Sequence, residues 1–455
     1  MTTTARRAVS GTNRTFDLLS LGTFVAVGLP DGMLGTAWPA MRRSLGAPVG
    51  DLGLILLVNT IGSVAVSAFV GRLIQRLGVP AVLTVAGCCG VVGGVGYAVA
   101  PGLWLVLCIG PLMGAAAGMM DGGLNTAVAL TGRPRLLNLL HGFYGIGTAF
   151  GPLLVTAAIL AGSWRPAYLV LVAVDLVAAG SWLVYHRKLA QPVLSHGELP
   201  EPVLSHGELP EPVLSHSELP EPVLSSSEGP AAAFMVSDET GISADPRATP
   251  EPTAGWSRRR VVLVLTAGLV LFFVYTGLEV SAGQWETSFL RGHVGLSASA
   301  AGLAAFGYWG ALTAVRIGLA LPAKSVSVQK VIGGGLSLSI AAAALIWWQP
   351  DTAASVAGFV LLGAALAGMF PALIAVTPQR IGKRRAEHAI AWQVGAAAGG
   401  GSAISALIGL LINSSGLDVL GPALVALAVL LLIANTALAR LAPIPTGWVS
   451  RAGAV

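Results

Sequence analysis

Residues 79–100 read VPAVLTVAGCCGVVGGVGYAVA, twenty-two residues without one charged side chain. A helix of this length rises about 33 Å, close to the ~30 Å thickness of the hydrocarbon core of a bilayer. A strand of a membrane barrel, in contrast, has about ten residues of alternating polarity. The stretch therefore predicts an α-helical membrane protein.

Similar apolar runs occupy most of the chain on both sides of this stretch. They are bounded by Gly, Pro or Arg and lie near 17–40, 51–74, 79–100, 102–130, 136–162, 166–186, 260–286, 297–320, 330–349, 352–376, 387–412 and 418–440. Each run is long enough to cross a bilayer. We therefore expect an all-α membrane protein with 12 transmembrane helices in two six-helix halves.

The composition of the 455-residue chain excludes several classes of protein. It is 54% hydrophobic and only 10% charged, with a mean hydropathy of +0.77, whereas soluble domains carry roughly 25% charged residues. The three cysteines have no metal-ligand spacing, and the sequence has no nucleotide-binding Gly-x4-Gly-Lys-Ser/Thr motif. We expect no enzyme activity, no metal, no cofactor and no nucleic-acid partner.

Basic residues are distributed unevenly over the loops. If both termini are cytoplasmic, 21 Lys and Arg residues fall on the cytoplasmic side, and four (Arg42, Arg43, Arg165 and Arg291) fall outside. Loops rich in Lys and Arg remain on the cytoplasmic side of a membrane. This predicts a multi-pass protein of the cell membrane with both termini in the cytoplasm.

The interval between the two groups of spans contains four decapeptides, QPVLSHGELP, EPVLSHGELP, EPVLSHSELP and EPVLSSSEGP. Regularly spaced Pro, Ser and acidic residues cannot form a packed core, so we expect a disordered linker; a metal-binding or pH-sensing tether is the alternative reading of its recurring histidines. The expected segments are a cytoplasmic tail at 1–16, a helix bundle at 17–186, the linker at 187–259, a second bundle at 260–441 and a cytoplasmic tail at 442–455.

The two groups of spans are related in sequence. An offset of 248 residues pairs Asp31 with Glu279, Gly35 with Gly283, Gly147 with Gly395, and Gly151 with Gly399. Transporters built from parallel repeats bind their substrate near the membrane midplane, between the two halves. The repeat therefore indicates a transporter with a site between its halves.

Two further sets of residues favour a transporter that changes conformation. The segment GRLIQRLG resembles the loop motif between spans two and three of the major facilitator superfamily, and Gln75 stands where that family usually has Asp. The glycines and proline at the middle of span five resemble a motif of proton-driven drug antiporters. The expected conformational residues are Gly71, Arg72, Gln75, Arg76, Gly78, Gly147, Gly151 and Pro152.

Within this superfamily, the chain is most similar to the fucose/proton symporter family. Four segments resemble that family: GMMDGGLN from Gly118, LNLLH from Leu137, GLE with GQW from Gly277, and AWQVG from Ala391. The resemblance implies proton-coupled uptake of a monosaccharide. It also implies that the proton-coupling acid of span four is Asp121.

Acidic residues deep in the predicted spans are the candidates for proton coupling. A charged residue at the centre of a bilayer costs about 2.5–3.5 kcal/mol on insertion scales, so it usually serves a function. We expect Asp121, Asp31 and Glu279 to bind protons. We expect Arg316, near the end of span eight, to extend towards the headgroups, with an ion pair between the halves as the alternative.

Amides, aromatic rings and a histidine at helical spacing around these acids predict a solute site. Hydroxyl groups of a sugar bind polar side chains, and its apolar face stacks on an aromatic ring. The expected substrate-binding residues are Asn125, His141, Asn138, Tyr275, Gln284, Trp285, Trp38, Trp392, Gln393 and Asn59.

The leading hypothesis is a secondary active transporter that couples the symport of a small neutral solute, such as a monosaccharide, to protons by alternating access. Proton-driven efflux of a drug or secondary metabolite is the alternative, and a transporter-like sensor is a third reading. The expected partners are the small-molecule substrate, protons and the lipid bilayer, and we expect a monomer.

Overall fold

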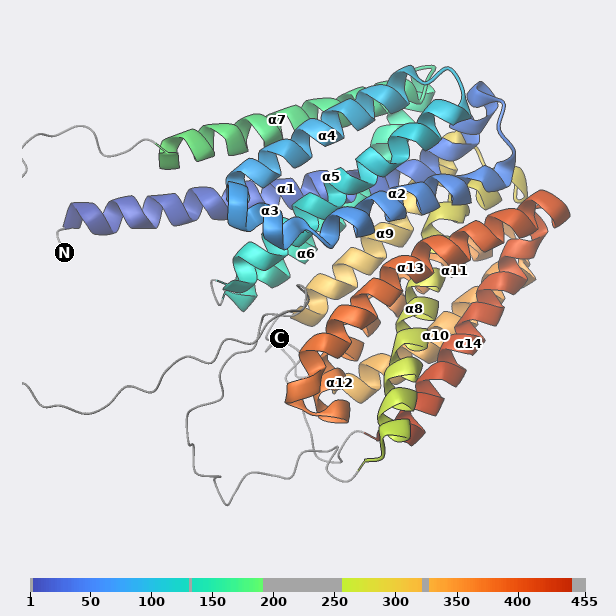
Figure 1. Ribbon diagram of the computed structural model, residues 1–455. Helices are drawn as coiled ribbons and strands as arrows, with labels where there is room; N and C mark the ends of the chain where they lie inside the picture. Colours follow the sequence, from blue (N-terminus) through green and yellow to red (C-terminus); the bar gives the residue numbers. More distant parts are fainter. Residues whose placement is uncertain (1–2, 131–132, 191–255, 321–326, 444–455) are drawn as a thin grey trace, which may run out of the picture. The chain divides into compact units, whose positions relative to one another are not determined.

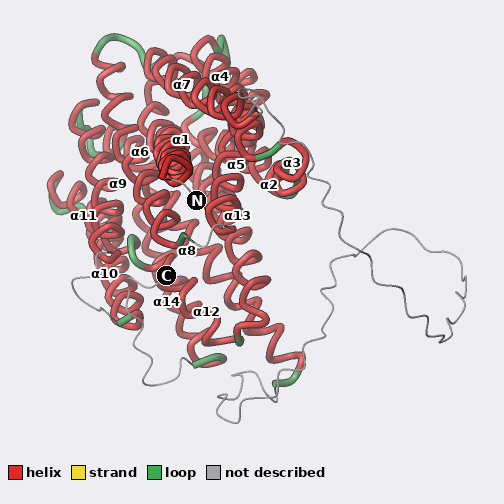
Figure 2. The backbone as a smooth tube through the Cα atoms, turned by 90° about the vertical axis from the view of Figure 1, so that its left-hand side faces the viewer, coloured by secondary structure: helices red, strands yellow, loops and turns green. Residues whose placement is uncertain are grey.

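The computed structural model describes residues 3–130, 133–190, 256–320 and 327–443, and within these ranges it has helices and no strands (Figure 2). The helices, in chain order, are α1 (Thr3–Leu45), η1 (Val49–Asp51), α2 (Leu52–Ser67), α3 (Val70–Leu77), α4 (Val79–Val99), α5 (Leu103–Leu130), α6 (Pro134–Leu160), α7 (Arg165–Ala190), α8 (Arg258–Gly292), α9 (Ala298–Ala320), α10 (Val328–Trp348), α11 (Thr352–Leu366), α12 (Met369–Ile381), α13 (Lys383–Ser415), η2 (Leu417–Val419) and α14 (Leu420–Leu441).

Twelve segments of the described chain are long and apolar enough to cross a membrane. This confirms the predicted all-α fold and the predicted number of spans. Helix α1 begins at Thr3, inside the range assigned to a tail. The decapeptide repeats lie outside the described residues, so the disordered linker stays a prediction.

Two of the predicted apolar runs are interrupted. The run at 51–74 divides into α2 and α3, and the run at 352–376 divides into α11 and α12. The second interruption, at Ala367 and Gly368, lies inside one candidate span. An interrupted helix leaves carbonyl groups without an intrahelical partner, so other groups must bind them.

The same helix pairs pack in both halves of the chain. In the N-terminal half, α1 packs on α6, α2 on α5, and α4 on α7. In the C-terminal half, the corresponding pairs are α8 with α13, α9 with α11, and α10 with α14. The two sets, coloured blue to green and yellow to red in Figure 1, are the halves that the sequence repeat predicts.

The halves meet mainly where α1 packs on α8, α2 on α13, and α6 on α9, and also where η1 packs on α13 and α1 on α9. The backbones touch where α1 leads into α2. A Cβ atom placed on Gly50 would lie 1.9 Å from the carbonyl oxygen of Gly409, and the amide of Gly50 donates to Oδ1 of Asn413 at 2.7 Å. We call this region the closed end. It also includes the adjoining contacts of Gly35 and Thr36 on α1 with Gln284 and Thr287 on α8, and so comprises residues 35–53, 284–287 and 405–420.

Glycine also sets the distance between α1 and α6. A Cβ atom on Gly147 would lie 2.2 Å from the carbonyl oxygen of Val25, so only glycine fits this contact. The sequence repeat pairs this residue with Gly395, but nothing lies within 4 Å of a Cβ there. The close contact between α13 and α8 is made by Gly400, whose Cβ would lie 2.0 Å from the oxygen of Phe273. The equivalent contact is therefore shifted along α13 by more than one helical turn.

The contact of α6 with α1 gives a direct test of this packing. We expect Gly147→Ala to lower the free energy of unfolding by about 1–3 kcal/mol, because the new methyl group would overlap the backbone of α1. Gly142→Ala on the same helix is the matched control, since its Cβ would lie at an ordinary 3.8 Å from Ile317. The measurement is the Tm of both purified variants in detergent. Equal Tm values would contradict the packing argument.

Candidate functional site

Two carboxylates of the N-terminal half lie close to each other, and one of them is on α1, which packs on α8 of the C-terminal half. Asp31 on α1 accepts a hydrogen bond from the hydroxyl of Tyr144 on α6 at 2.5 Å. Asp121 on α5 accepts one from Nδ2 of Asn125, one turn further along the helix, at 2.9 Å. Both aspartates are exposed, and they lie close enough for their charges to repel each other. In the described part of the chain neither of them is in an ion pair.

The third acid, Glu279 on α8, has a charged partner. Nη2 of Arg316 on α9 lies 3.1 and 3.2 Å from the two carboxylate oxygens. The hydroxyl of Tyr275 reaches the same carboxylate, and Tyr308 donates to the main-chain oxygen of Glu279 at 2.7 Å. The expectation that Arg316 extends to the headgroups is wrong, because its side chain turns inward and neutralises this acid. The pair lies within the C-terminal half, so it is not the ion pair between halves either.

The same residues bind the free main-chain carbonyl groups at the interruption between α11 and α12. Nε of Arg316 donates to the carbonyl of Ala367 at 3.0 Å, and the hydroxyl of Tyr275 lies 2.9 Å from the carbonyl of Leu366. These carbonyls are at the interruption between α11 and α12. Without water, an unpaired carbonyl in the membrane costs several kcal/mol. The ion pair therefore holds the interruption against α8 and α9.

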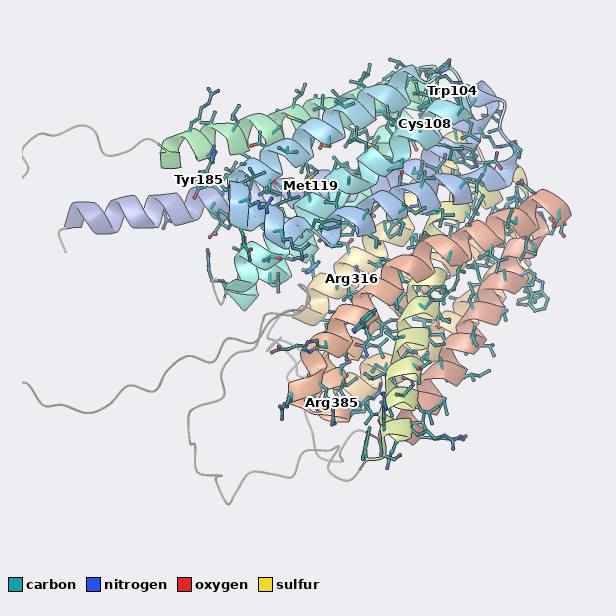
Figure 3. The ribbon with its side chains drawn as sticks, in the orientation of Figure 1. Trp104, Cys108, Met119, Tyr185, Arg316 and Arg385 are labelled. Atoms are coloured by element: carbon teal, nitrogen blue, oxygen red, sulfur yellow. The ribbon has the colours of Figure 1, made fainter. Side chains whose placement is uncertain are left out.

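These groups form one polar region across the boundary between the halves. Tyr144 interacts electrostatically with both Glu279 and Arg316. Arg316, labelled on α9 in Figure 3, also interacts with His141 on α6. We call Asp31, Asp121, Tyr144, Glu279 and Arg316 the interface polar cluster.

Gln284 connects the cluster to the closed end. Its Nε2 donates to the main-chain oxygen of Asp31 at 2.7 Å, which is a direct hydrogen bond between α8 and α1. A Cβ atom on Gly35 would lie 2.6 Å from the carbonyl oxygen of Gln284, so glycine is required for this approach. Oε1 of Gln284 is buried and has no partner among the described residues. This oxygen is therefore a hydrogen-bond acceptor beside the interface polar cluster that has no donor among the described residues.

Four other expected substrate-binding side chains make hydrogen bonds to their neighbours in the helix packing. Nε1 of Trp38 donates to the main-chain oxygen of Val49 at 2.6 Å, and Oδ1 of Asn59 accepts from the hydroxyl of Tyr97 at 3.1 Å. Nε1 of Trp285 lies 3.2 Å from the main-chain oxygen of Ser405 and 3.0 Å from its Oγ. Oε1 of Gln393 lies 3.1 Å from Oγ1 of Thr377.

The remaining expected residues have different surroundings. His141 is exposed, with its ring edge-on to Phe24 at 5.8 Å between centroids. Trp392 is 71% exposed. The hydroxyl of Tyr275 is bound at the interruption between α11 and α12. The side chain of Asn138 lies outside the described residues.

The expected conformational residues fall into two groups. Gly78 ends α3 at φ +79°, a conformation that favours glycine. Arg72, Gln75 and Arg76 lie on α3, and Arg72 is 6.0 Å from the ring of Phe69. Nothing lies within 4 Å of a Cβ on Gly71.

The glycines of α6, in contrast, pack directly on α1. A Cβ on Gly151 would lie 2.7 Å from the carbonyl oxygen of Leu29, and a Cβ on Gly32 would lie 3.0 Å from Cδ of Pro152. This contact lies beside Asp31 in the sequence of α1. The group therefore positions the helix that carries one of the acids.

One further ion pair joins α1 and α6 at the end that carries the N-terminus. Nη1 and Nη2 of Arg133 lie 2.7 and 2.5 Å from the two carboxylate oxygens of Asp17. This hydrogen bonding raises the pKa of Arg133 above its ordinary value. Because Arg133 is partly exposed, water and salt screen this pair, and it contributes about 1 kcal/mol or less to stability.

Tyr144 and Tyr308 are site residues that the sequence analysis did not identify. Tyr144 lies three residues after His141, so the two side chains lie on the same face of α6. That spacing is a signal from which it could have been found. For Tyr308 the sequence offers no comparable signal.

Comparisons with known proteins agree with this architecture. A model of the family described as the Major Facilitator Superfamily matches residues 19–322. Similar solved structures include the nucleoside transporter NupG, at 12% identity and a TM-score of 0.63, covering 94% of this chain and 98% of that chain. They also include FucP, a Major Facilitator Superfamily transporter in the outward conformation, at 13% identity and a TM-score of 0.54, covering 92% of this chain and 98% of that chain. At these identities the similarity shows the fold alone. A search of curated proteins found no match.

The ion pair at the interruption can be tested by a double-mutant cycle. We expect Glu279→Gln and Arg316→Gln each to lower the free energy of unfolding by about 3 kcal/mol, because each leaves one charge unpaired in the membrane. The double variant should lose much less than the sum of the two.

The measurement is unfolding of the purified variants in detergent. Arg385→Gln is the control, since this exposed arginine, labelled in Figure 3, forms no ion pair among the described residues. Strictly additive losses would show that the two side chains do not stabilise each other.

Proposed function

The chain belongs to the Major Facilitator Superfamily, and we propose that it is a proton-coupled symporter of a small neutral polar solute, such as a monosaccharide, that works by alternating access. It is a multi-pass membrane transporter and not an enzyme. The observation that carries the proposal is the interface polar cluster, in which two exposed carboxylates without a cation face an ion pair on the other half.

Asp121 is the chief proton-binding residue in this proposal, and Asp31 is the second. A carboxyl group that is hydrogen-bonded to a neutral partner can gain or lose a proton without breaking an ion pair. Asn125 and Tyr144 are such partners. Repulsion between the two carboxylates couples their charge states. Protonation of Glu279 would release Arg316, so this acid links proton binding to the interruption in α11–α12.

The charges around the site support a neutral solute. The one cation of the interface polar cluster, Arg316, is neutralised by Glu279 and is therefore not available to an anionic solute. Uncharged hydrogen-bonding groups remain at Gln284 and Asn125, and we propose the exposed ring of Trp392 on α13 as the surface on which the solute stacks. These groups match the hydroxyls and apolar face of a sugar. Because NupG is described as a nucleoside transporter, nucleosides belong among the solutes to be tested.

The proposed orientation follows from the basic residues. Both termini are placed in the cytoplasm of a cell, and the closed end faces outwards, since the loops richest in Lys and Arg lie at the opposite end. The conformation described here then has its outer side closed. We propose that the protein works in the lipid bilayer of the cell membrane as a monomer.

Proton-driven efflux is the second candidate function. Its support is the contact of Gly147, Gly151 and Pro152 with α1 beside Asp31, since this motif resembles that of drug antiporters. In symport, protons cross the membrane in the same direction as the solute; in antiport, they cross in the opposite direction.

Internal pH in proteoliposomes distinguishes the two. We expect external addition of a hexose, deoxyhexose or nucleoside to acidify the lumen, and uptake to rise as external pH falls, because the proton is a co-substrate. Asp121→Asn should abolish acidification and accumulation but retain solute counterflow, since asparagine imitates the protonated acid. Glu387→Gln, at an exposed acid of α13, is the control.

Acidification that survives Asp121→Asn would contradict the assignment of the proton. Lumenal alkalinisation during export of lipophilic cations, with no response to sugars or nucleosides, would replace symport by efflux.

A further inference from the structure

Glu286 on α8 is an acid that the proposed cycle does not yet use. Its exposed fraction is 0%, and neither carboxyl oxygen has a hydrogen-bond partner among the described residues. Asp31 and Asp121, in contrast, are exposed, and Glu279 is ion-paired. Glu286 therefore differs from every acid of the interface polar cluster.

The surroundings of Glu286 determine its charge. An ionised carboxylate with no cation or donor costs several kcal/mol in a low-dielectric interior, and the neutral acid costs much less. Even the neutral acid lacks an acceptor for its O–H group, so the residue does not stabilise this conformation. An ionisable residue inside a membrane that contributes no stability is a candidate for a functional role.

Glu286 lies on the same face of α8 as Glu279. The spacing of 279, 283 and 286 follows one helical stripe. At the middle of the stripe, Gly283 leaves room for α9: a Cβ there would lie 2.3 Å from Cζ2 of Trp309 and 2.8 Å from Cε1 of Tyr308. Tyr308 interacts electrostatically with both Glu279 and Glu286. Its hydroxyl donates to the main-chain oxygen of Glu279 and makes no hydrogen bond to Glu286.

Other titratable and charged groups lie on α8 itself and on the helices that pack against it. On α8 and α9 the near groups are Tyr275, Tyr308 and Arg316. The N-cap of α11 is Asp351. The rest, among the described side chains, are Arg14, Asp17, Asp31, Arg42 and Arg43 on α1, Arg258, Arg259 and Arg260 at the start of α8, Arg291 and His293 at its end, Asp418 in η2, Arg380 on α12, Arg384, Arg385, Glu387 and His388 on α13, and Arg440 on α14. Arg291 interacts with Arg43, and His293 pairs with Asp418.

Charge balance links the two acids of the stripe. Glu279, Glu286 and Arg316 are two carboxyl groups and one guanidinium, so the set is neutral only when it holds one proton. We propose that Glu279 and Glu286 share this proton, that Glu286 holds it in the conformation seen here, and that Glu286 is a further proton-binding residue of the transport cycle, in addition to Asp121 and Asp31. This inference rests on the proposed proton coupling.

The residues that flank Glu286 connect it to the closed end. Gln284 donates to the main-chain oxygen of Asp31, and Oγ1 of Thr287 lies 3.4 Å from Oγ1 of Thr36. Both contacts join α8 to α1 and must break when the halves separate there. The same movement displaces the segment that carries Glu286 and changes its surroundings. The proton is therefore held while this end is closed and exchanged when it opens.

The test is Glu286→Gln in proteoliposomes, with wild type and Ser288→Ala assayed beside it. Ser288 is a buried polar residue of the same helix, and its hydroxyl also has no partner among the described residues, but it does not titrate. We expect Glu286→Gln to retain solute counterflow and to lose solute-driven acidification and accumulation. Ser288→Ala should retain all three.

A spectroscopic measurement on wild type covers the case in which Glu286→Gln does not fold. With carbon-13 in the glutamate carboxyl groups, infrared spectra at neutral pH should contain an isotope-shifted band of a protonated carboxyl group. The absence of this band would overturn the inference.

The outcomes separate this inference from the proposed function. If wild type moves no protons with any solute, the proposed proton coupling fails, and the cycle role of Glu286 fails with it. If wild type couples and Glu286→Gln couples with the same pH dependence, the inference alone is overturned.

Discussion

The ion pair of Arg316 with Glu279 is the interaction on which the arrangement of the other charged groups depends. A lone guanidinium in a membrane is costly, and the pair removes that cost while leaving Nε of Arg316 free to bind the carbonyl of Ala367. The interruption in the tenth span is thereby attached to α8 and α9. Arg316 interacts electrostatically with Tyr144 and His141 of α6, so its charge also acts on the N-terminal half. A change in protonation at this pair would act on an interrupted helix and on both halves at once.

The second constraint is the close approach of helices at glycine. At the closed end, Gly50 meets Gly409 and Gly35 meets Gln284, with main-chain atoms closer than any side chain would permit. These contacts join α1 and η1 to α8 and α13 with few side-chain interactions to break. Separation of the halves at this end therefore costs a small number of hydrogen bonds, among them those of Gln284 and Asn413. Such an interface is suited to alternate between two states.

The sequence predicts the spans, the two halves and the position of the acids well, because long apolar runs, an internal repeat and charges inside apolar runs are local signals. It does not predict how each helix is rotated against its neighbours. Gln284 and Trp285 are adjacent, but successive side chains on a helix point about 100° apart. Gln284 therefore reaches α1, whereas Trp285 binds Ser405 on α13. The partners of Asn59 and Arg316 lie 38 and 37 residues away, and no spacing rule identifies them.

The central claim is that the closed end must open for solute to cross. Nδ2 of Asn413 lies 3.4 Å from Oδ1 of Asp51, so cysteines at these two positions can be joined by a short thiol-specific cross-linker in a background that lacks Cys88, Cys89 and Cys108. The measurement is solute uptake before and after cross-linking. The account predicts that the cross-linked double variant Asp51→Cys/Asn413→Cys stops uptake and that each single variant, treated in the same way, continues. Undiminished uptake by the fully cross-linked protein would contradict it.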